Sequence, residues 1–245
     1  MTARLEGKTA LITGGARGQG AAHGRRLADE GANVILGDIL EDAGQAHARE
    51  LRAAGHDVRF LRLDVTTPGD WNAAVDAAET RFGQLDILVN NAGVVRVEPI
   101  VDESDDGWHT TMAVNATGVF YGMRAAIPAL RRNGGGSIIN IASIYGPVGA
   151  PGYVAYTASK GAVMAMTKVA ALEHAQDRIR VNAICPGPVR TPMSEQEGDD
   201  SVDITPLRRR AEPEEISSAV AFLASDDAIY ITGAELAVDG GYLAR

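Results

Sequence analysis

A chain of 245 residues, 45% of them hydrophobic, is long enough for one large α/β domain or at most two small ones. The formal net charge of −9 disfavours partners with a dense negative charge, so we expect the protein to bind no nucleic acid and no membrane. Cys185 is the one cysteine, which excludes an intrachain disulfide, and the absence of a signal peptide or membrane-spanning apolar run predicts a cytoplasmic protein.

Short apolar runs alternate with helical patterns along the chain. Strands are expected at residues 8–13, 32–38, 57–64, 85–90, 137–143, 179–186 and 235–239. Helices are expected at residues 18–30, 41–54, 68–82, 104–132, 154–176 and 213–224. Several strand runs are almost continuously apolar, which is typical of parallel strands buried on both faces. The pattern predicts a single Rossmann-type doubly wound α/β domain over residues 1–245, with a seven-stranded parallel sheet and helices on both faces.

Residues 191–211 lack clear periodicity and predict a long, mobile loop of the kind that often serves as a substrate lid. Its acidic run, 195–203, would repel the phosphate of coenzyme A or of a carrier protein. The basic cluster 208–210 would accept that phosphate. The charges of this loop therefore exclude few substrates, because most charge clusters are solvated surface.

Three glycines follow the first expected strand and open the first expected helix: Gly14, Gly18 and Gly20. Glycine permits a sharp turn and a close approach of the backbone, and a helix N-terminus presents N–H groups to a pyrophosphate. A plain glycine turn is the competing interpretation, and it suits residues 133–136 and 240–241, which precede no helix. The first cluster has both the strand and the helix that a dinucleotide site requires.

The second expected strand ends at Asp38, eighteen residues after Gly20. A carboxylate at this place accepts hydrogen bonds from the adenosine ribose hydroxyls and repels a 2′-phosphate. It therefore favours NAD(H) over NADP(H). Arg17, in the glycine loop, favours NADP(H) instead, because a basic residue there can pair with a 2′-phosphate.

Tyr156 follows Ser143 by thirteen residues, and Lys160 follows Tyr156 by four, on the same face of a helix. Ser143 ends a strand, at the rim where open α/β sheets bind ligands. A phenol ordinarily titrates at a pKa of ~10, and nearby positive charge lowers that pKa. Tyr156 could then exchange a proton with an alcohol or ketone, while Ser143 stabilises the substrate oxygen. The competing interpretation is an ordinary helix surface.

These residues together resemble the short-chain dehydrogenase/reductase family, over essentially the whole chain. The resemblance implies a catalytic tetrad of Asn115, Ser143, Tyr156 and Lys160, with Asn115 holding a helix kink. It also implies adenine contacts at Asp64-Val65, a cofactor-lining motif at residues 90–93, and nicotinamide contacts at residues 186–191. The cofactor residues implied in full are Gly14, Arg17, Gly18, Gln19, Gly20, Asp38, Asp64, Val65, Asn91, Ala92, Gly93, Tyr156, Lys160, Pro186, Gly187, Val189 and Thr191.

Within the family, the tail 231–241 and the loop 133–137 look most like bacterial NAD-dependent secondary-alcohol and hydroxysteroid dehydrogenases. The family also implies a homotetramer, built partly on the helices at 104–132 and 154–176. We expect a hydrophobic secondary alcohol or ketone as substrate, because the residues that should wall its pocket are mostly apolar. These residues are Val94, Val95, Ile144, Tyr145, Val148, Tyr153, Pro188 and Met193.

Two alternatives remain open at this point. One is a 3-oxoacyl-carrier-protein reductase, which shares the tetrad but generally uses NADPH, against the indication of Asp38. The other is a regulator that senses NAD(H) without turnover, although such proteins typically lose the tyrosine or the lysine. No catalytic metal is expected, because the five histidines show no metal-ligand spacing.

Overall fold

The structure of the chain is a computed structural model that describes residues 3–194 and 200–244. Within these residues, seven strands form one sheet in the order β3-β2-β1-β4-β5-β6-β7, and every neighbouring pair is parallel. The order confirms the predicted doubly wound sheet. The strands are β1 (Thr9–Thr13), β2 (Asn33–Asp38), β3 (Val58–Arg62), β4 (Ile87–Asn90), β5 (Gly136–Ile141), β6 (Ile179–Pro186) and β7 (Glu235–Val238).

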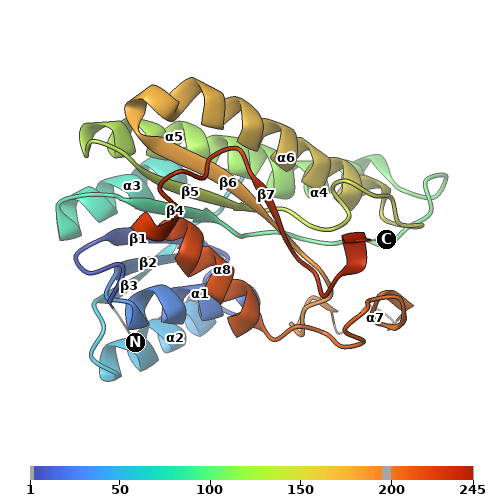
Figure 1. Cartoon of the computed structure of the whole chain (residues 1–245), viewed down its shortest axis with the longest axis horizontal. Coiled ribbons are helices and arrows are strands. Elements are labelled where there is room, and N and C mark those ends of the chain that lie inside the picture. The colour runs from blue at the N-terminus through green and yellow to red at the C-terminus, as the bar shows by residue number, and fades with distance from the viewer. Residues whose placement is uncertain (1–2, 195–199, 245) are drawn as a thin grey trace.

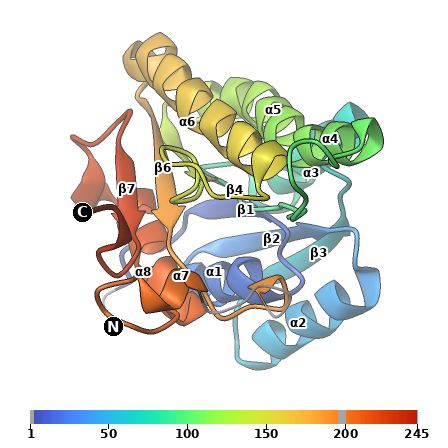
Figure 2. The same cartoon turned by 90° about the vertical axis from the view of Figure 1, so that its right-hand side faces the viewer.

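Helices cover both faces of the sheet (Figures 1 and 2). One layer contains α3 (Pro68–Phe82), α4 (Asp105–Met112), α5 (Gly118–Arg132) and α6 (Val154–His174). The other contains α1 (Gly18–Asp29), α2 (Glu41–Ala53) and α8 (Pro213–Ala224). Short helical turns complete the described part of the chain: η2 (Ala175–Asp177), α7 (Asp200–Asp203), η4 (Asp226–Ala228) and η5 (Tyr242–Ala244).

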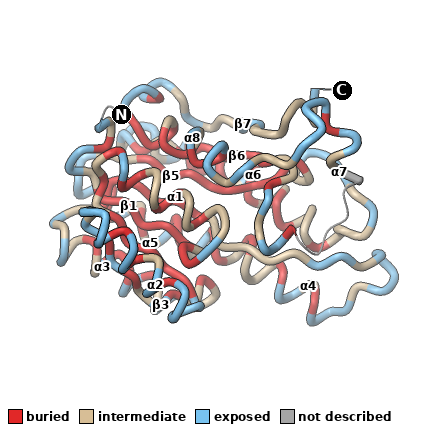
Figure 3. Tube along the Cα trace, turned by 90° about the horizontal axis from the view of Figure 1, so that it is seen from below, coloured by how far each residue is buried: buried red, intermediate tan, exposed pale blue. Residues whose placement is uncertain are grey.

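Two apolar cores, one on each face of the sheet, explain why the strand sequences are continuously apolar. Leu11 on β1 and Leu88 on β4 belong to the core beneath α3, α5 and α6. Their neighbours Ile12 and Val89 belong to the core beneath α1 and α8. Successive strand side chains point to opposite faces, so a sheet covered on both sides buries them all. Figure 3 shows the buried strands running through the middle of the molecule.

The helical pattern predicted over 104–132 is present, but it is not one regular α-helix. The segment contains α4, then a π-helical turn η1 (Ala113–Thr117), then α5. A π-helical turn holds one extra residue in the helix and is frequently found at functional sites. Periodicity of apolar residues cannot reveal such a turn, because the extra residue disturbs the pattern by only one position.

The expected lid loop is more structured than the sequence indicates. Val189 and Ala211 form a parallel β-bridge that closes its base. Residues 200–203 form α7, and the backbone N–H of Leu207 donates to the carbonyl oxygen of Gly240 over 3.1 Å. Residues 195–199 of the expected acidic run lie outside the described residues. The mobility of the loop, its role as a lid and the assignment of residues 1–245 to one domain stay predictions.

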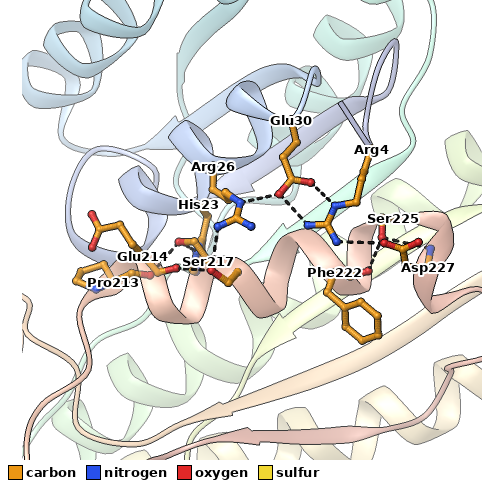
Figure 4. Close-up of polar contacts among 11 residues, drawn as sticks. Arg4, His23, Arg26, Glu30, Pro213, Glu214, Ser217, Phe222, Ser225 and Asp227 are labelled. Atoms are coloured by element: carbon orange, nitrogen blue, oxygen red, sulfur yellow. Dashed lines mark hydrogen bonds and ion pairs between the residues drawn. The ribbon is translucent and has the colours of Figure 1, made fainter. Parts of the chain in front are cut away.

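Polar contacts join α1 to α8 (Figure 4). Glu30 is 2% exposed and accepts hydrogen bonds from Arg4 (2.7 and 2.8 Å) and Arg26 (2.6 Å). Burial alone would raise the pKa of Glu30, but these two guanidinium groups outweigh it and lower that pKa. His23 is fully buried, with its Nδ1 atom 2.8 Å from Ser217 Oγ. Arg26 Nη1 also donates to Ser218 Oγ over 2.9 Å, so two side-chain contacts link α1 to α8.

Candidate active site

The site begins where β1 and β4 lie side by side, at the point where the strand order reverses. Thr13 ends β1, and its Oγ1 atom accepts the backbone N–H groups of Asn91 (3.0 Å) and Ala92 (3.1 Å). The side-chain amide of Asn91 donates to the carbonyl oxygen of Thr13 over 2.8 Å. These bonds hold the ends of the two strands together. A crevice beside such a reversal is where open α/β sheets bind ligands.

The glycine turn lies over this reversal, and its geometry requires glycine. Gly14 has φ +65° and Gly18 has φ +57°, the left-handed region that disfavours other residues. A Cβ atom on Gly20 would lie 2.0 Å from the carbonyl oxygen of Gly14. Among the described residues, no side chain caps the N-terminus of α1, and Gln19 Oε1 is buried without a hydrogen-bond partner. The turn thus leaves polar groups for a ligand such as a pyrophosphate.

Asp38 lies at the end of β2 and is 8% exposed. One carboxylate oxygen accepts the N–H of Ala16 in the glycine turn, and the other accepts the N–H of Leu40, each over 3.0 Å. The carboxylate is therefore fixed beside the turn. Arg17 lines the same cavity and is exposed.

The catalytic candidates converge at the ends of β5 and α6. Ser143 is buried, and its Oγ atom accepts the N–H of Tyr145 over 3.1 Å. Lys160 is buried, and its ammonium donates to the carbonyl oxygen of Ile141 over 2.8 Å. Its Nζ atom lies 5.6 Å from the centre of the Tyr156 ring. Burial lowers the pKa of Lys160 to about 8.

Asn115 lies in the π-helical turn, fully buried behind the catalytic candidates. Its side-chain amide pairs with the backbone of Val94: Oδ1 accepts the N–H over 2.8 Å, and Nδ2 donates to the carbonyl oxygen over 2.9 Å. A Cβ atom on Gly93 would lie 3.3 Å from Asn115 Oδ1 and 3.7 Å from Lys160 Nζ. The structure therefore places Asn115 close to Lys160, as the family resemblance implies, although Asn115 does not line the cavity.

One cavity of about 370 Å³ gathers these groups. Every residue of the expected cofactor set lines it, together with Ser143. The cavity thus joins the glycine turn and Asp38 at one end to Tyr156 and Lys160 at the other.

The substrate wall was predicted only in part. Val94, Ile144, Tyr145, Pro188 and Met193 line the cavity. Val95, Val148 and Tyr153 do not, because the segments 95–101 and 147–153 extend outward from the strand ends. Tyr153 nevertheless packs against the wall, since its ring centre lies 5.0 Å from that of Tyr145 and 6.3 Å from that of Tyr156.

Sequence reasoning missed several residues of this region. Most of them follow a predicted residue in the chain or precede one, so proximity could have found them: Ile39, Leu40, Leu63, Ile141, Ala142, Pro192 and Ser194. Val114 lines the cavity from the π-helical turn. Tyr242 comes from the C-terminal turn η5, and its ring lies 6.3 Å from that of Tyr145, edge to face. No local signal in the sequence marks Tyr242, because its position depends on how the last turn folds back.

The described residues contain no group of three or more His, Cys, Asp or Glu side chains that could hold a metal ion. No helix among them is both long and apolar enough to cross a membrane.

Known proteins identify this arrangement. Residues 14–243 match the protein family described as enoyl-(acyl carrier protein) reductase. The chain is 50% identical over 244 residues to a 3-alpha-(or 20-beta)-hydroxysteroid dehydrogenase of Mycobacterium tuberculosis, covering 100% of this chain and 92% of that protein. This chain belongs to the short-chain dehydrogenase/reductase family.

Further relatives support this identification. A cyclopentanol dehydrogenase of Comamonas testosteroni is 45% identical over 248 residues, which cover 99% of each chain. A solved short-chain type dehydrogenase/reductase from Mycobacterium marinum superposes with a TM-score of 0.95 at 35% identity, covering 99% of this chain and 98% of that one. The predicted family and fold are thereby confirmed.

As a short-chain dehydrogenase/reductase, the protein is an oxidoreductase that acts on a CH–OH group with a nicotinamide cofactor. The glycine turn, Asp38 and the buried Gln19 oxygen fit such a cofactor. The contacts of Asp38 with Ala16 and Leu40 bear on the choice between NAD and NADP.

Proposed function

We propose that this short-chain dehydrogenase/reductase transfers a hydride between NAD(H) and a hydrophobic secondary alcohol or its ketone. The proposal rests on one observation: a single cavity contains the glycine turn with Asp38, the trio of Ser143, Tyr156 and Lys160, and a mostly apolar wall. The proposed site residues are those of the expected cofactor set and tetrad, and the wall residues Tyr145, Pro188 and Met193.

The preference for NAD(H) is supported by how Asp38 is held. Its carboxylate is bonded to the backbone on both sides, at Ala16 and at Leu40, so it cannot easily turn away from an adenosine ribose. A 2′-phosphate would be brought against a buried negative charge. The next residue, Ile39, offers no positive charge to compensate. Arg17 is exposed at the edge of the cavity, and we infer that its positive charge does not outweigh the buried carboxylate of Asp38.

The chemistry assigned to the chain is proton transfer and charge stabilisation. Tyr156 gives a proton to the ketone oxygen, or takes one from the alcohol. Lys160 supplies a buried positive charge near the Tyr156 ring, which favours the phenolate. The hydroxyl of Ser143 holds the substrate oxygen. When bound, the nicotinamide carries the hydride.

The hydrophobic substrate class is supported by the wall of the cavity. Tyr145 and Tyr153 pack against each other, with Pro188 and Met193 lining the cavity nearby. The relatives named above act on a hydroxysteroid and on cyclopentanol, both secondary alcohols on an apolar ring. We infer a substrate of the same chemical type.

We also propose a cytoplasmic homotetramer. Apolar side chains on the outer layer are exposed, with Phe120 at 43%, Val169 at 54% and Leu172 at 83%. They lie on α5 and α6, the helices that the family resemblance assigns to subunit contacts. Burying such side chains against a second copy would be favourable.

The test is the oxidation of NADH and of NADPH by the purified protein with a panel of steroid, cyclic and aromatic ketones. Turnover with NADH and little with NADPH is the expected result. Turnover mainly with NADPH would overturn the cofactor assignment and favour a carrier-protein reductase, whose substrate would then be tested directly. Tight NADH binding with no turnover on any ketone would favour the NAD(H)-sensing alternative.

A further inference from the structure

Ser159 connects two members of the proposed tetrad. It lies on α6 between Tyr156 and Lys160, and it is fully buried. Its Oγ atom donates to the carbonyl oxygen of Tyr156 over 2.7 Å and accepts from Asn115 Nδ2 over 3.1 Å. A hydroxyl has one proton, so these two bonds fix the orientation of the Ser159 O–H group toward the carbonyl oxygen of Tyr156. Each residue donates to the next: Asn115 donates to Ser159, and Ser159 donates to Tyr156.

The amide of Asn115 is fully used by this arrangement. One N–H of Nδ2 goes to the carbonyl oxygen of Val94 and the other to Ser159, while Oδ1 accepts the N–H of Val94. The side chain of Asn115 therefore links three elements: the segment after β4, the π-helical turn and the first turn of α6. Without Ser159, α6 would lose its side of this link.

The region tolerates little displacement. A Cβ atom on Gly93 would be tight against Asn115 Oδ1 (3.3 Å) and in ordinary contact with Lys160 Nζ (3.7 Å), so these groups are packed closely around Gly93. Lys160 is fixed separately, through its bond to the carbonyl oxygen of Ile141. A shift of the first turn of α6 would consequently move Tyr156 relative to the ammonium of Lys160.

We propose that Ser159 is a positioning residue, which holds Tyr156 at its working distance from Lys160 by tying the first turn of α6 to Asn115. The proposal rests on the proposed function. Ser159 lies in the buried layer behind Tyr156, so it acts through Tyr156 and Asn115. Its role is distinct from that of Ser143, which lines the cavity.

Thr157 provides a matched control on the same turn of α6. Its Oγ1 atom is buried and has no hydrogen-bond partner among the described residues. Thr157→Val removes a buried hydroxyl of the same helix without breaking a bond. Ser159→Ala removes a buried hydroxyl that makes two bonds, and Ser159→Thr retains the hydroxyl.

The experiment has two readouts, measured for wild type and all three variants. The first is kcat and KM for a ketone with NADH. The second is the ultraviolet titration of the Tyr156 phenol, taken as the difference between each protein and the same protein carrying Tyr156→Phe. Ser159→Ala should lower kcat roughly 10- to 100-fold with little change in KM, as expected for a misplaced catalytic group. Its Tyr156 should also titrate at a higher pH than in wild type.

The controls sharpen the result. Thr157→Val should resemble wild type in both readouts, and Ser159→Thr should recover most of the lost kcat. If Ser159→Ala does not fold, Ser159→Cys takes its place, because a thiol is a weaker donor and should show the same changes to a smaller degree.

The proposal is overturned if Ser159→Ala and Thr157→Val agree in kcat and in the Tyr156 titration, whatever happens to their melting temperatures. If wild type turns over no ketone, the proposed function fails. The titration needs no substrate, so it still decides whether Ser159 positions Tyr156.

Discussion

The carboxylate of Asp38 accepts a hydrogen bond from the backbone N–H of Ala16 over 3.0 Å, so the end of β2 is fastened to the glycine turn. The contact places a negative charge at one end of the cavity. In the proposed function, this side chain selects the cofactor.

Replacing Asp38 by Ser should relax the preference for NADH. The ratio of kcat/KM for NADH to that for NADPH should fall roughly tenfold or more, because the negative charge that repels the 2′-phosphate is gone. Adding Arg17→Ala to this variant should remove most of the gain with NADPH. An unchanged ratio in Asp38→Ser would contradict the assignment.

Replacing Tyr156 by Phe should abolish turnover while NADH still binds. The loss in kcat should be about 10²- to 10⁴-fold, the usual contribution of a positioned acid or base. NADH fluorescence titration checks binding in the same sample. Retained turnover would refute the role of Tyr156.

Tyr242 should influence which ketones are accepted. Because its ring packs edge to face on Tyr145, Tyr242→Ala should raise KM for a steroid ketone several-fold more than KM for cyclopentanone. Tyr230 is fully exposed, and Tyr230→Ala serves as a control for the loss of a surface tyrosine. Equal effects of Tyr242→Ala on both ketones would show that Tyr242 does not select substrates.

Lys160 should make the protein less stable at neutral pH. Burial lowers its pKa from 10.5 to about 8, so the folded protein holds a buried cation below pH 8. Between pH 8 and 10.5 the unfolded chain binds more protons, and the unfolding free energy of wild type should therefore rise with pH. Lys160→Met should be more stable than wild type at pH 7 by roughly 1–3 kcal/mol and inactive, with the difference shrinking toward pH 10. Denaturant titrations at several pH values measure this.

His23 should make the protein sensitive to acid. Burial lowers its pKa from 6.5 to about 3, so the unfolded chain takes up the proton first as the pH falls. The unfolding free energy should then drop by up to about 1.4 kcal/mol per pH unit between pH 6.5 and 3. Denaturant titration of His23→Gln should show a shallower decline. A decline as steep as that of wild type would assign the acid sensitivity to other groups.

The sheet could be predicted well because the pattern that marks each strand lies within a few consecutive residues. The apolar runs of β1, β2, β4, β5 and β6 record burial on both faces, and most helices show their own periodicity. The glycine cluster and the spacing of Tyr156 and Lys160 were likewise readable, since neighbours in the chain form each motif.

The remaining features depend on contacts between distant segments. The π-helical turn contains Asn115, whose side chain pairs with the backbone of Val94, twenty-one residues away. Tyr242 reaches Tyr145 from the opposite end of the chain, and Ser159 matters because Asn115 happens to lie beside it. Such pairings leave no periodic signal, so the apolar pattern could not reveal them, and only the family resemblance pointed to a kink at Asn115.

The π-helical turn also couples the position of Asn115 to the rotation of a whole helix. Each residue advances an α-helix by about 100°, so winding Ala113–Thr117 as a regular α-helix, with no residue removed, would turn the residues of α5 by about that angle. Val119, Met123 and Ala126, now in the core, would rotate away from it. The core-facing positions of α5 are therefore matched to the wider turn before it, and that turn cannot adopt regular α-helical winding without moving these side chains out of the core.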